Sequence, residues 1–135
     1  MPTLTFPTSF DFLDEIRSFV GDQARQAGFN AKDVYSIQLA TDEAASNVIE
    51  HAYGGNPHGK FKVSCEFKED RLVITLLDHG KSFEPSRVKE PNMKADLLER
   101  KVGGLGIYLM HKLMDEVRYA STPAGNVLTL IKRKG

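Results

Sequence analysis

The sequence predicts an α+β fold, a two-layer α/β sandwich in which one mixed, mostly antiparallel sheet carries its helices on one face. Two segments near the start, 8–28 and 30–52, place apolar residues at the 3.6-residue spacing of helices. Two later segments, 60–77 and 118–132, are typical of strand pairs joined by short turns. This order of helices and antiparallel strands favours the α+β class.

The chain begins with a short predicted strand, Thr3–Phe6, and a helix that Thr8 is expected to cap, with Asp11 three residues further on. Gly28 is expected to form the C-cap of this helix. The residues between them form an apolar stripe, which predicts a helix packed on a core: Phe12, Leu13, Ile16, Phe19, Val20 and Ala24.

A second helix is predicted to start at the cap residue Asn30, with Asp33 in its first turn. Residues that break helices end it: Gly54, Gly55 and Pro57. Its apolar stripe comprises Val34, Ile37, Ala40, Thr41, Ala44, Ala45, Val48 and Ala52.

A hairpin is predicted next. Lys60–Phe67 alternates between apolar and polar residues, Glu69 and Asp70 form the turn, and Arg71–Leu77 is almost continuously apolar. The second of these strands is therefore expected to be buried on both faces of the sheet.

The last third of the chain contains a loop, a helix and a hairpin. Residues 84–102 are polar, include two prolines and lack a long apolar period, which predicts a functional loop or lid. The glycine-rich step Gly103–Gly106 opens a third helix, expected to run through Val117. Arg118–Ser121 and Val127–Lys132 are predicted to pair around a turn.

Composition narrows the class of protein. The chain has 135 residues, the size of one domain, so residues 1–135 are expected to form a single unit. Lys and Arg total 18 and Asp and Glu total 18, a neutral balance that argues against a dedicated nucleic-acid binder. The lone Cys65 excludes an internal disulfide and a multi-cysteine zinc site. The chain lacks a membrane-length apolar run and the pattern of a signal peptide, so we expect a cytoplasmic protein without membrane attachment.

Three constellations bear on function, and the first lies on the second helix. Glu43, Asn47 and His51 are spaced by four residues and share one helical face. A carboxylate such as Glu43 can act as a general base, and the carboxamide oxygen of Asn47 suits Mg²⁺. A solvated helix face is the alternative interpretation.

The second constellation, Asp78-His-Gly-Lys-Ser-Phe83, directly follows the apolar strand. The carboxylate of Asp78 can accept a hydrogen bond from the exocyclic amine of a base, and Gly80 lets a flat ligand approach the backbone. An ordinary Asp-x-Gly turn is the alternative.

The third constellation opens the third helix: Gly103, Gly104, Leu105 and Gly106. Backbone N–H groups at a helix start favour phosphate, although no Gly-Lys-Ser/Thr follows as in a Walker A loop. A flexible hinge is the alternative.

The order and spacing of the three constellations resemble the GHKL superfamily, which includes gyrase, histidine kinases and heat-shock chaperone ATPases. The resembling segments are 42–53, 78–83 and 103–110. Among its members, the chain looks most like the stand-alone anti-sigma factor serine kinases of bacterial partner-switching systems, which act in transcription regulation.

The resemblance implies the Bergerat ATP-binding fold and a role for each motif residue. Glu43 would be the general base, Asn47 the Mg²⁺ ligand at the nucleotide, and Asp78 the acceptor for the adenine amino group. The remaining residues would bind the cofactor, ATP: Gly80 and Phe83 at the adenine, and Gly103, Gly104, Leu105 and Gly106 at the phosphates. Residues 84–102 would be the ATP lid.

Two positions depart from the family pattern. Members often place a threonine after the glycine that precedes the last strand, where it helps to hold adenine through water. This chain has Asn126 after Gly125, so that role has no assigned residue. Members also carry a basic lid residue near the phosphates, where this chain has Arg100 and Lys101 followed by Val102.

The resemblance predicts an ATP-dependent protein serine/threonine kinase and anti-sigma regulatory factor. Its substrate would be an anti-sigma antagonist protein, a sigma factor or other effector would bind a second surface, and a homodimer is suggested. Two alternatives stay open: a nucleotide-gated module that sequesters a partner without catalysis, and a detached ATPase module.

Overall fold

The computed structural model describes residues 1–52, 58–80 and 104–135. Its elements, in chain order, are β1 (Thr3–Pro7), a 3-10 turn η1 (Phe10–Phe12), α1 (Leu13–Gln26), α2 (Ala31–Asn47), a π-helical turn η2 (Val48–Ala52), β2 (Lys60–Lys68), β3 (Arg71–Asp78), α4 (Gly104–Leu113), β4 (Glu116–Thr122) and β5 (Gly125–Arg133). The strands form one sheet in the order β1-β2-β3-β5-β4, and each of the four pairings is antiparallel.

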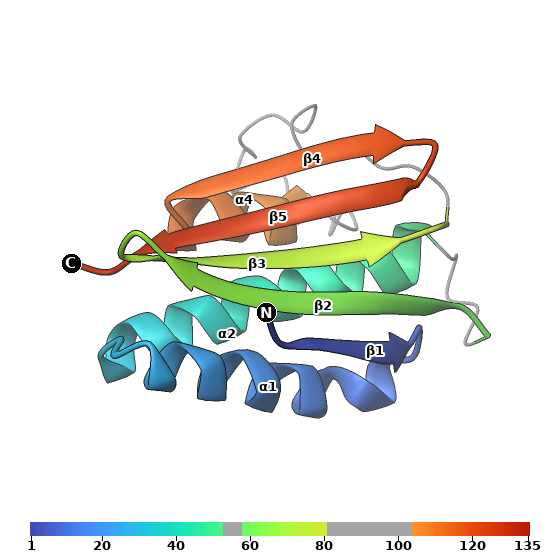
Figure 1. Ribbon diagram of the computed structural model, residues 1–135. Coiled ribbons are helices and arrows are strands. Elements are labelled where there is room, and N and C mark those ends of the chain that lie inside the picture. The colour runs from blue at the N-terminus through green and yellow to red at the C-terminus, as the bar shows by residue number, and fades with distance from the viewer. Residues whose placement is uncertain (53–57, 81–103) are drawn as a thin grey trace.

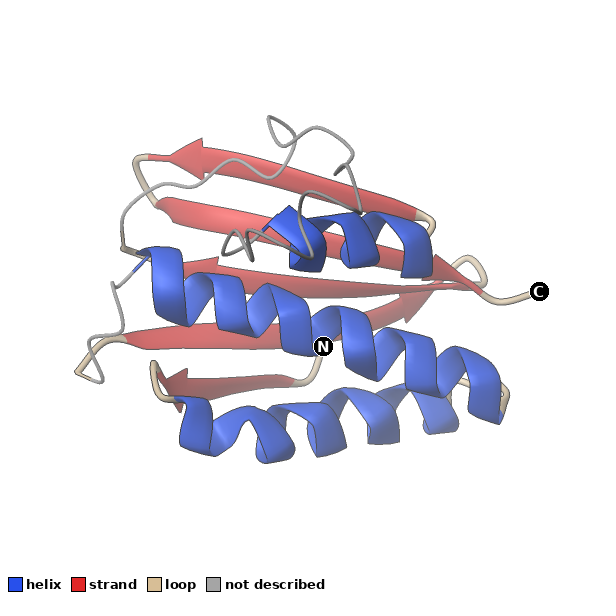
Figure 2. Ribbon diagram, turned by 180° about the vertical axis from the view of Figure 1, so that it is seen from behind, coloured by secondary structure: helices blue, strands red, loops and turns tan. Residues whose placement is uncertain are grey.

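The helices α1, α2 and α4 all lie on one face of this sheet (Figures 1 and 2). The predicted α+β sandwich with helices on one face is therefore confirmed, and the sheet is antiparallel in every pairing described. Burial on both faces of β3 was a wrong expectation. Its residues alternate between buried and half-buried, since the helices cover only the face that carries Leu72, Ile74 and Leu76.

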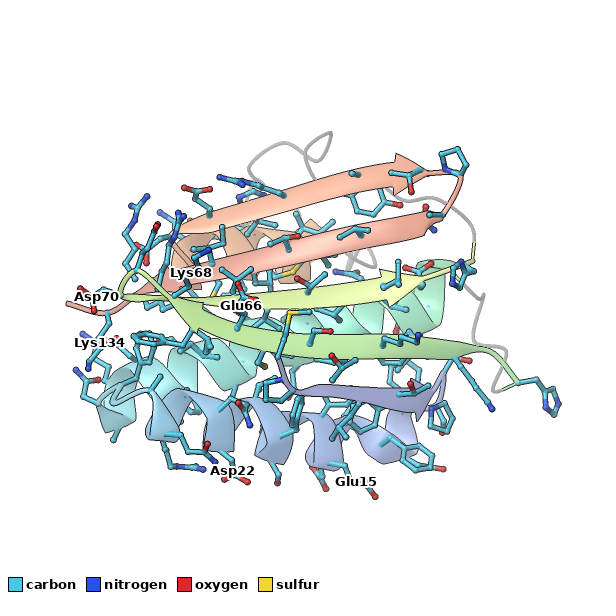
Figure 3. All side chains as sticks on the ribbon, viewed as in Figure 1. Glu15, Asp22, Glu66, Lys68, Asp70 and Lys134 are labelled. Atoms are coloured by element: carbon cyan, nitrogen blue, oxygen red, sulfur yellow. The ribbon has the colours of Figure 1, made fainter. Side chains whose placement is uncertain are left out.

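The cap of the first helical segment lies one residue later than the sequence predicted. Ser9, not Thr8, accepts a hydrogen bond through its side chain, from the backbone N–H of Asp11 at the start of η1. Thr8 is fully buried, between the end of β1 and the start of η1. The outer face of α1 is polar, and Glu15 and Asp22 point away from the sheet (Figure 3).

The end of α1 is a Schellman motif around Gly28, whose φ of +92° favours glycine. The Gly28 N–H donates to the Arg25 carbonyl at 3.0 Å, and the Phe29 N–H donates to the Ala24 carbonyl at 3.1 Å. Asn30 then caps α2 by accepting from the Asp33 N–H at 2.8 Å. Both helix boundaries follow from local sequence signals.

The hairpin of β2 and β3 turns at Glu69 and Asp70, which both adopt positive φ, as expected for a tight two-residue turn. The third long helix is shorter than predicted, because α4 ends at Leu113 and Val117 belongs to β4. No helix within 1–52, 58–80 or 104–135 is long and apolar enough to cross a membrane.

Helices and sheet enclose one apolar core. Both predicted helix stripes contribute to it, together with the helix-facing residues of β2, β3 and β5. Cys65 is among these residues, and burial raises the pKa of its thiol to about 12, so it acts as an apolar side chain. The largest fully buried side chains are Phe61, Ile16, Ile37, Ile49, Leu72, Ile74, Leu76, Ile107, Met110 and Leu130.

Candidate functional site

Segments far apart in sequence meet at one end of the molecule. The C-terminal end of α2, the C-terminal end of β3 and the turn between β4 and β5 lie at this end in both views (Figures 1 and 2). Helix α4 packs beside α2. The fold therefore gathers the described parts of the three predicted constellations.

Asp78 is held in a hydrogen-bond network at the end of β3. Its side chain is buried, and Oδ1 accepts from the Gly80 N–H at 2.9 Å and from Asn126 Nδ2 at 2.8 Å. Asn126 Nδ2 also donates to the Gly80 carbonyl at 2.9 Å. The network fixes the Asp78–Gly80 turn, beside which an open hollow of about 330 Å³ is lined in part by Gly80 and Asn126.

The sequence analysis missed Asn126 as a site residue. It lies directly opposite Asp78 in the register of β3 and β5, and it is equally buried. The signal was available, because a strand ending at Asp78 and a strand starting at Gly125 bring these positions together when they pair antiparallel. Gly125 has a φ of +134°, and a Cβ there would lie 2.8 Å from the Asp78 carbonyl oxygen, so the turn requires glycine.

Glu43 lies on α2 against the start of α4. A Cβ placed on Gly106 would overlap Glu43 Oε2 and lie 3.4 Å from Cδ, so the absence of a side chain at Gly106 leaves room for this carboxylate. Burial raises the pKa of Glu43, and the nearby carboxylates of Asp42 and Glu50 raise it further. A half-buried carboxylate with a raised pKa has the character of a general base.

Asn47 ends α2, one helical turn beyond Glu43, where the backbone widens into the π-helical turn η2. Such turns are frequent at functional sites. Asn47 is 5% exposed, and its Nδ2 has no hydrogen-bond partner among the described residues. Rotating the carboxamide by 180° would present an oxygen there without a partner among the described residues, which fits one ligand of a Mg²⁺ ion that takes its others from phosphate and water. Within the described part of the chain, no cluster of three His, Cys, Asp or Glu residues offers another metal site.

The neighbour of Glu43 is tied to α1 by an ion pair that the sequence analysis did not find. Arg17 donates to Asp42 Oδ2 from Nε at 3.0 Å and from Nη2 at 2.7 Å. The opposite oxygen, Asp42 Oδ1, is buried without a partner among the described residues. A polar residue on the inner side of α1 was the available signal, but its partner 25 residues away depends on helix packing.

The remaining predicted site residues fall partly inside and partly outside the described residues. Phe83, Gly103 and the expected lid 84–102 lie outside the described residues. Gly104 and Leu105 form the first turn of α4, and His51 lies in η2.

The comparisons with known proteins identify the family. A family model for the histidine kinase-like ATPase domain matches residues 6–132. The chain belongs to this family. The resemblance to the GHKL superfamily, predicted from the three constellations, is thereby confirmed.

Three similar proteins within the family are serine-protein kinases. The chain is similar to the serine-protein kinase RsbW of Halalkalibacterium halodurans, with 32% identity over 96% of this chain and 80% of the relative. It is also similar to the RsbW proteins of Bacillus licheniformis, with 34% identity over 83% of this chain and 72% of the relative, and of Bacillus subtilis, with 31% identity over the same shares. The expectation of a protein serine/threonine kinase in this family is confirmed.

Solved structures support the same fold. The RsbU and RsbW domains of a Mycobacterium tuberculosis protein match with a TM-score of 0.67 and 19% identity, over 99% of this chain and 33% of that one. A chain of the SiaB–SiaC complex from Pseudomonas aeruginosa matches with a TM-score of 0.68 and 16% identity, over 98% of this chain and 88% of that one. At these identities the likeness concerns the fold alone.

Proposed function

We propose that the chain is an ATP-dependent protein serine/threonine kinase and anti-sigma regulatory factor that phosphorylates an anti-sigma antagonist protein. The observation that carries this proposal is the setting of Glu43. Its carboxylate is half-buried, has a raised pKa and lies against the glycine-rich start of α4, where phosphate would bind. A module that only sequesters a partner has no need of a base in this position.

In this proposal the purine is recognised at the ends of β3 and β5. This part of the site, with Asp78, Gly80 and Asn126, is called the strand side. The Asp78 carboxylate is an acceptor-only group in a buried position, suited to the exocyclic amine of adenine. Gly80 leaves the backbone open to a flat ring, and Phe83 completes the adenine pocket in this proposal. The N–H groups of Gly103, Gly104, Leu105 and Gly106 would donate to the phosphates.

Mg²⁺ bound with ATP would neutralise charge on the phosphates during transfer. Asn47 would supply one oxygen ligand to it, with the carboxamide rotated so that its oxygen takes the place of Nδ2, which has no partner among the described residues. Glu43 would accept the proton of the substrate hydroxyl, and the packing of α4 on α2 would keep this carboxylate in place. The lid in this proposal is 84–102.

The rest of the proposal concerns organisation and partners. Residues 1–135 would act as one domain in the cytoplasm, where ATP is available, without direct contact to nucleic acid or membrane. A sigma factor or other effector would bind a second surface. A homodimer belongs to the same proposal.

The test begins with a pull-down from the native cytosol with and without ATP, followed by a search for phosphoserine and phosphothreonine on the captured proteins. Transfer of labelled phosphate from ATP to a captured antagonist is the expected result. Binding without transfer would favour the sequestering module, and release of free phosphate alone would favour a detached ATPase. Asn47→Ala should weaken Mg²⁺-dependent ATP binding and transfer together, while metal-free nucleotide binding stays close to wild type.

A further inference from the structure

Asn126 stands where family members often place a threonine, and its side chain connects three strands at the proposed purine site. Asp78, Asn126 and Ser121 occupy register-matched positions on three adjacent strands, β3, β5 and β4. Ser121 Oγ donates to Asn126 Oδ1 at 2.9 Å, and Asn126 Nδ2 donates onward to Asp78 Oδ1 at 2.8 Å. A single row of side-chain hydrogen bonds therefore runs across the sheet to the carboxylate.

The chemistry of this row fixes the orientation of the Asn126 amide. Its two N–H donors face two acceptors, Asp78 Oδ1 and the Gly80 carbonyl. Its oxygen faces the Ser121 hydroxyl, which can donate. The reversed amide would set an oxygen against two acceptors in a buried position, so only one orientation satisfies the bonds.

Two results follow for Asp78. Oδ1 already accepts from Asn126 and from the Gly80 N–H, so the carboxylate cannot rotate without breaking bonds, and Oδ2 is the oxygen that can serve a ligand amine. Asn126 uses both of its amide hydrogens on protein acceptors, so it has none to offer a ring nitrogen of a base. Its influence on a purine is therefore exerted through Asp78.

We infer that Asn126 is a positioning residue that, supported by Ser121, orients Asp78 to select a purine with a 6-amino group over a 6-oxo purine. The inference rests on the proposed adenine role of Asp78. A 6-oxo purine would set its oxygen against a carboxylate that is held as an acceptor, which is unfavourable. Loosening Asn126 would let the carboxylate turn aside and weaken this discrimination.

The experiment measures the dissociation constants of ATP and of inosine triphosphate, which differ at the 6-position, and compares their ratio among variants. Wild type should prefer ATP by about 10- to 150-fold, the range expected for a hydrogen bond to a charged group. Asn126→Ala should lower the ratio by roughly 2- to 10-fold, a part of the wild-type preference, because Asn126 acts on the purine only through Asp78. Ser121→Ala should lower it about twofold, because it removes only the support of the amide.

Two variants separate positioning from general damage to the fold. Thr122→Ala is the matched control, because the neighbouring hydroxyl bonds the Gly125 carbonyl in the turn and makes no bond to Asn126 or Asp78. It should leave the ratio unchanged. Asn126→Thr keeps a hydroxyl donor near Asp78 and should recover part of the ratio lost in Asn126→Ala.

The outcomes distinguish this inference from the function on which it rests. A wild type that binds ATP and inosine triphosphate equally would overturn the adenine role of Asp78. A selective wild type whose ratio persists in folded Asn126→Ala and Ser121→Ala would overturn the positioning role alone. Should Asn126→Ala fail to fold, an unchanged ratio in Ser121→Ala would overturn the positioning role by itself, because Ser121 is exposed and its substitution leaves the core intact.

Discussion

On the strand side of the candidate site the polar side chains are hydrogen-bonded to one another. On the helix side, formed by α2 and the start of α4, two buried polar atoms have no partner among the described residues. Asp78 Oδ1 accepts two hydrogen bonds, and Asn126 uses its oxygen and both amide hydrogens. Asn47 Nδ2 and Asp42 Oδ1 are buried and have no partner in the described part of the chain, and the pKa of Glu43 is raised.

The contrast indicates how the two sides would bind a ligand. A satisfied network is rigid and presents one fixed pattern of acceptors, which suits selection of a base. Unpartnered polar atoms cost stability until something binds them, and such costs concentrate at functional sites. The strand side is thus formed in advance, and the helix side is completed by phosphate and metal in our proposal. Substitutions on the helix side should therefore lower the rate of phosphate transfer, and substitutions on the strand side should lower the affinity for nucleotide.

The largest effect is expected on the helix side. Glu43→Gln keeps the shape of the side chain and removes the proposed base, so single-turnover phosphate transfer to the antagonist should fall by about 100- to 10,000-fold. The affinity for Mg–ATP should change little, because the strand side is intact. Transfer at the wild-type rate would show that Glu43 is not the base, and the solvated-face interpretation of α2 would then be preferred.

On the strand side the effect should appear in binding. Asp78→Asn replaces an acceptor-only carboxylate by an amide, which must present a donor either to the ligand or to Asn126 Nδ2. We expect a loss of ATP affinity of about 1.5–3 kcal/mol, roughly 10- to 150-fold, by calorimetry. Unchanged affinity in the folded variant would remove Asp78 from the adenine site.

A comparison of two glycines tests whether the helix side depends on close packing. Gly106→Ala places a methyl group against the Glu43 carboxylate, and a displacement of about 1 Å can lower a transfer rate on the order of 100-fold. Gly21→Ala is the control, because its methyl group would also be added at a glycine that packs against α2 but would displace the end of Gln38, which donates to the Arg17 carbonyl, and not the Glu43 carboxylate. Equal transfer rates in the two variants would contradict the packing role of Gly106.

A smaller effect, on stability, is expected for the ion pair that joins α1 to α2. Arg17→Ala leaves the half-buried Asp42 without its only described partner, so the free energy of unfolding should fall by about 1–3 kcal/mol. Arg25→Ala removes a comparable arginine whose pair with Asp22 is exposed, and should cost about 0–0.5 kcal/mol. Chemical denaturation measures both. Similar losses would mean that the Arg17–Asp42 pair is no more than a surface contact.

The smallest effect concerns the stability of the fold when Glu43 is ionised. Because the pKa of Glu43 is raised in the fold, the native state holds this proton more tightly than the unfolded state does. The ionised side chain therefore destabilises the fold above the raised pKa, and this loss disappears as the pH falls through it. Glu43→Gln should raise Tm slightly at neutral pH, and the gain should vanish near pH 4. A gain that is independent of pH would point to packing instead.

The sequence by itself determined the features that depend on local chemistry. The Gly28 and Asn30 signals predicted the boundary between α1 and α2, and the spacing of four predicted that Glu43 and Asn47 share a face. These patterns are set by backbone geometry within one or two turns. The order of three short motifs sufficed to predict the family, because all three follow the motif order of that family along the chain.

Tertiary structure decided the contacts between elements. The bond between Asp78 and Asn126 joins residues 48 positions apart, and that between Arg17 and Asp42 joins residues 25 apart. The one-sided burial of β3 likewise depends on where the helices lie, which an apolar run does not reveal. The physical reason is the same in each case. Side-chain hydrogen bonds and burial depend on which surfaces meet in three dimensions, and local sequence fixes only the shape of each element.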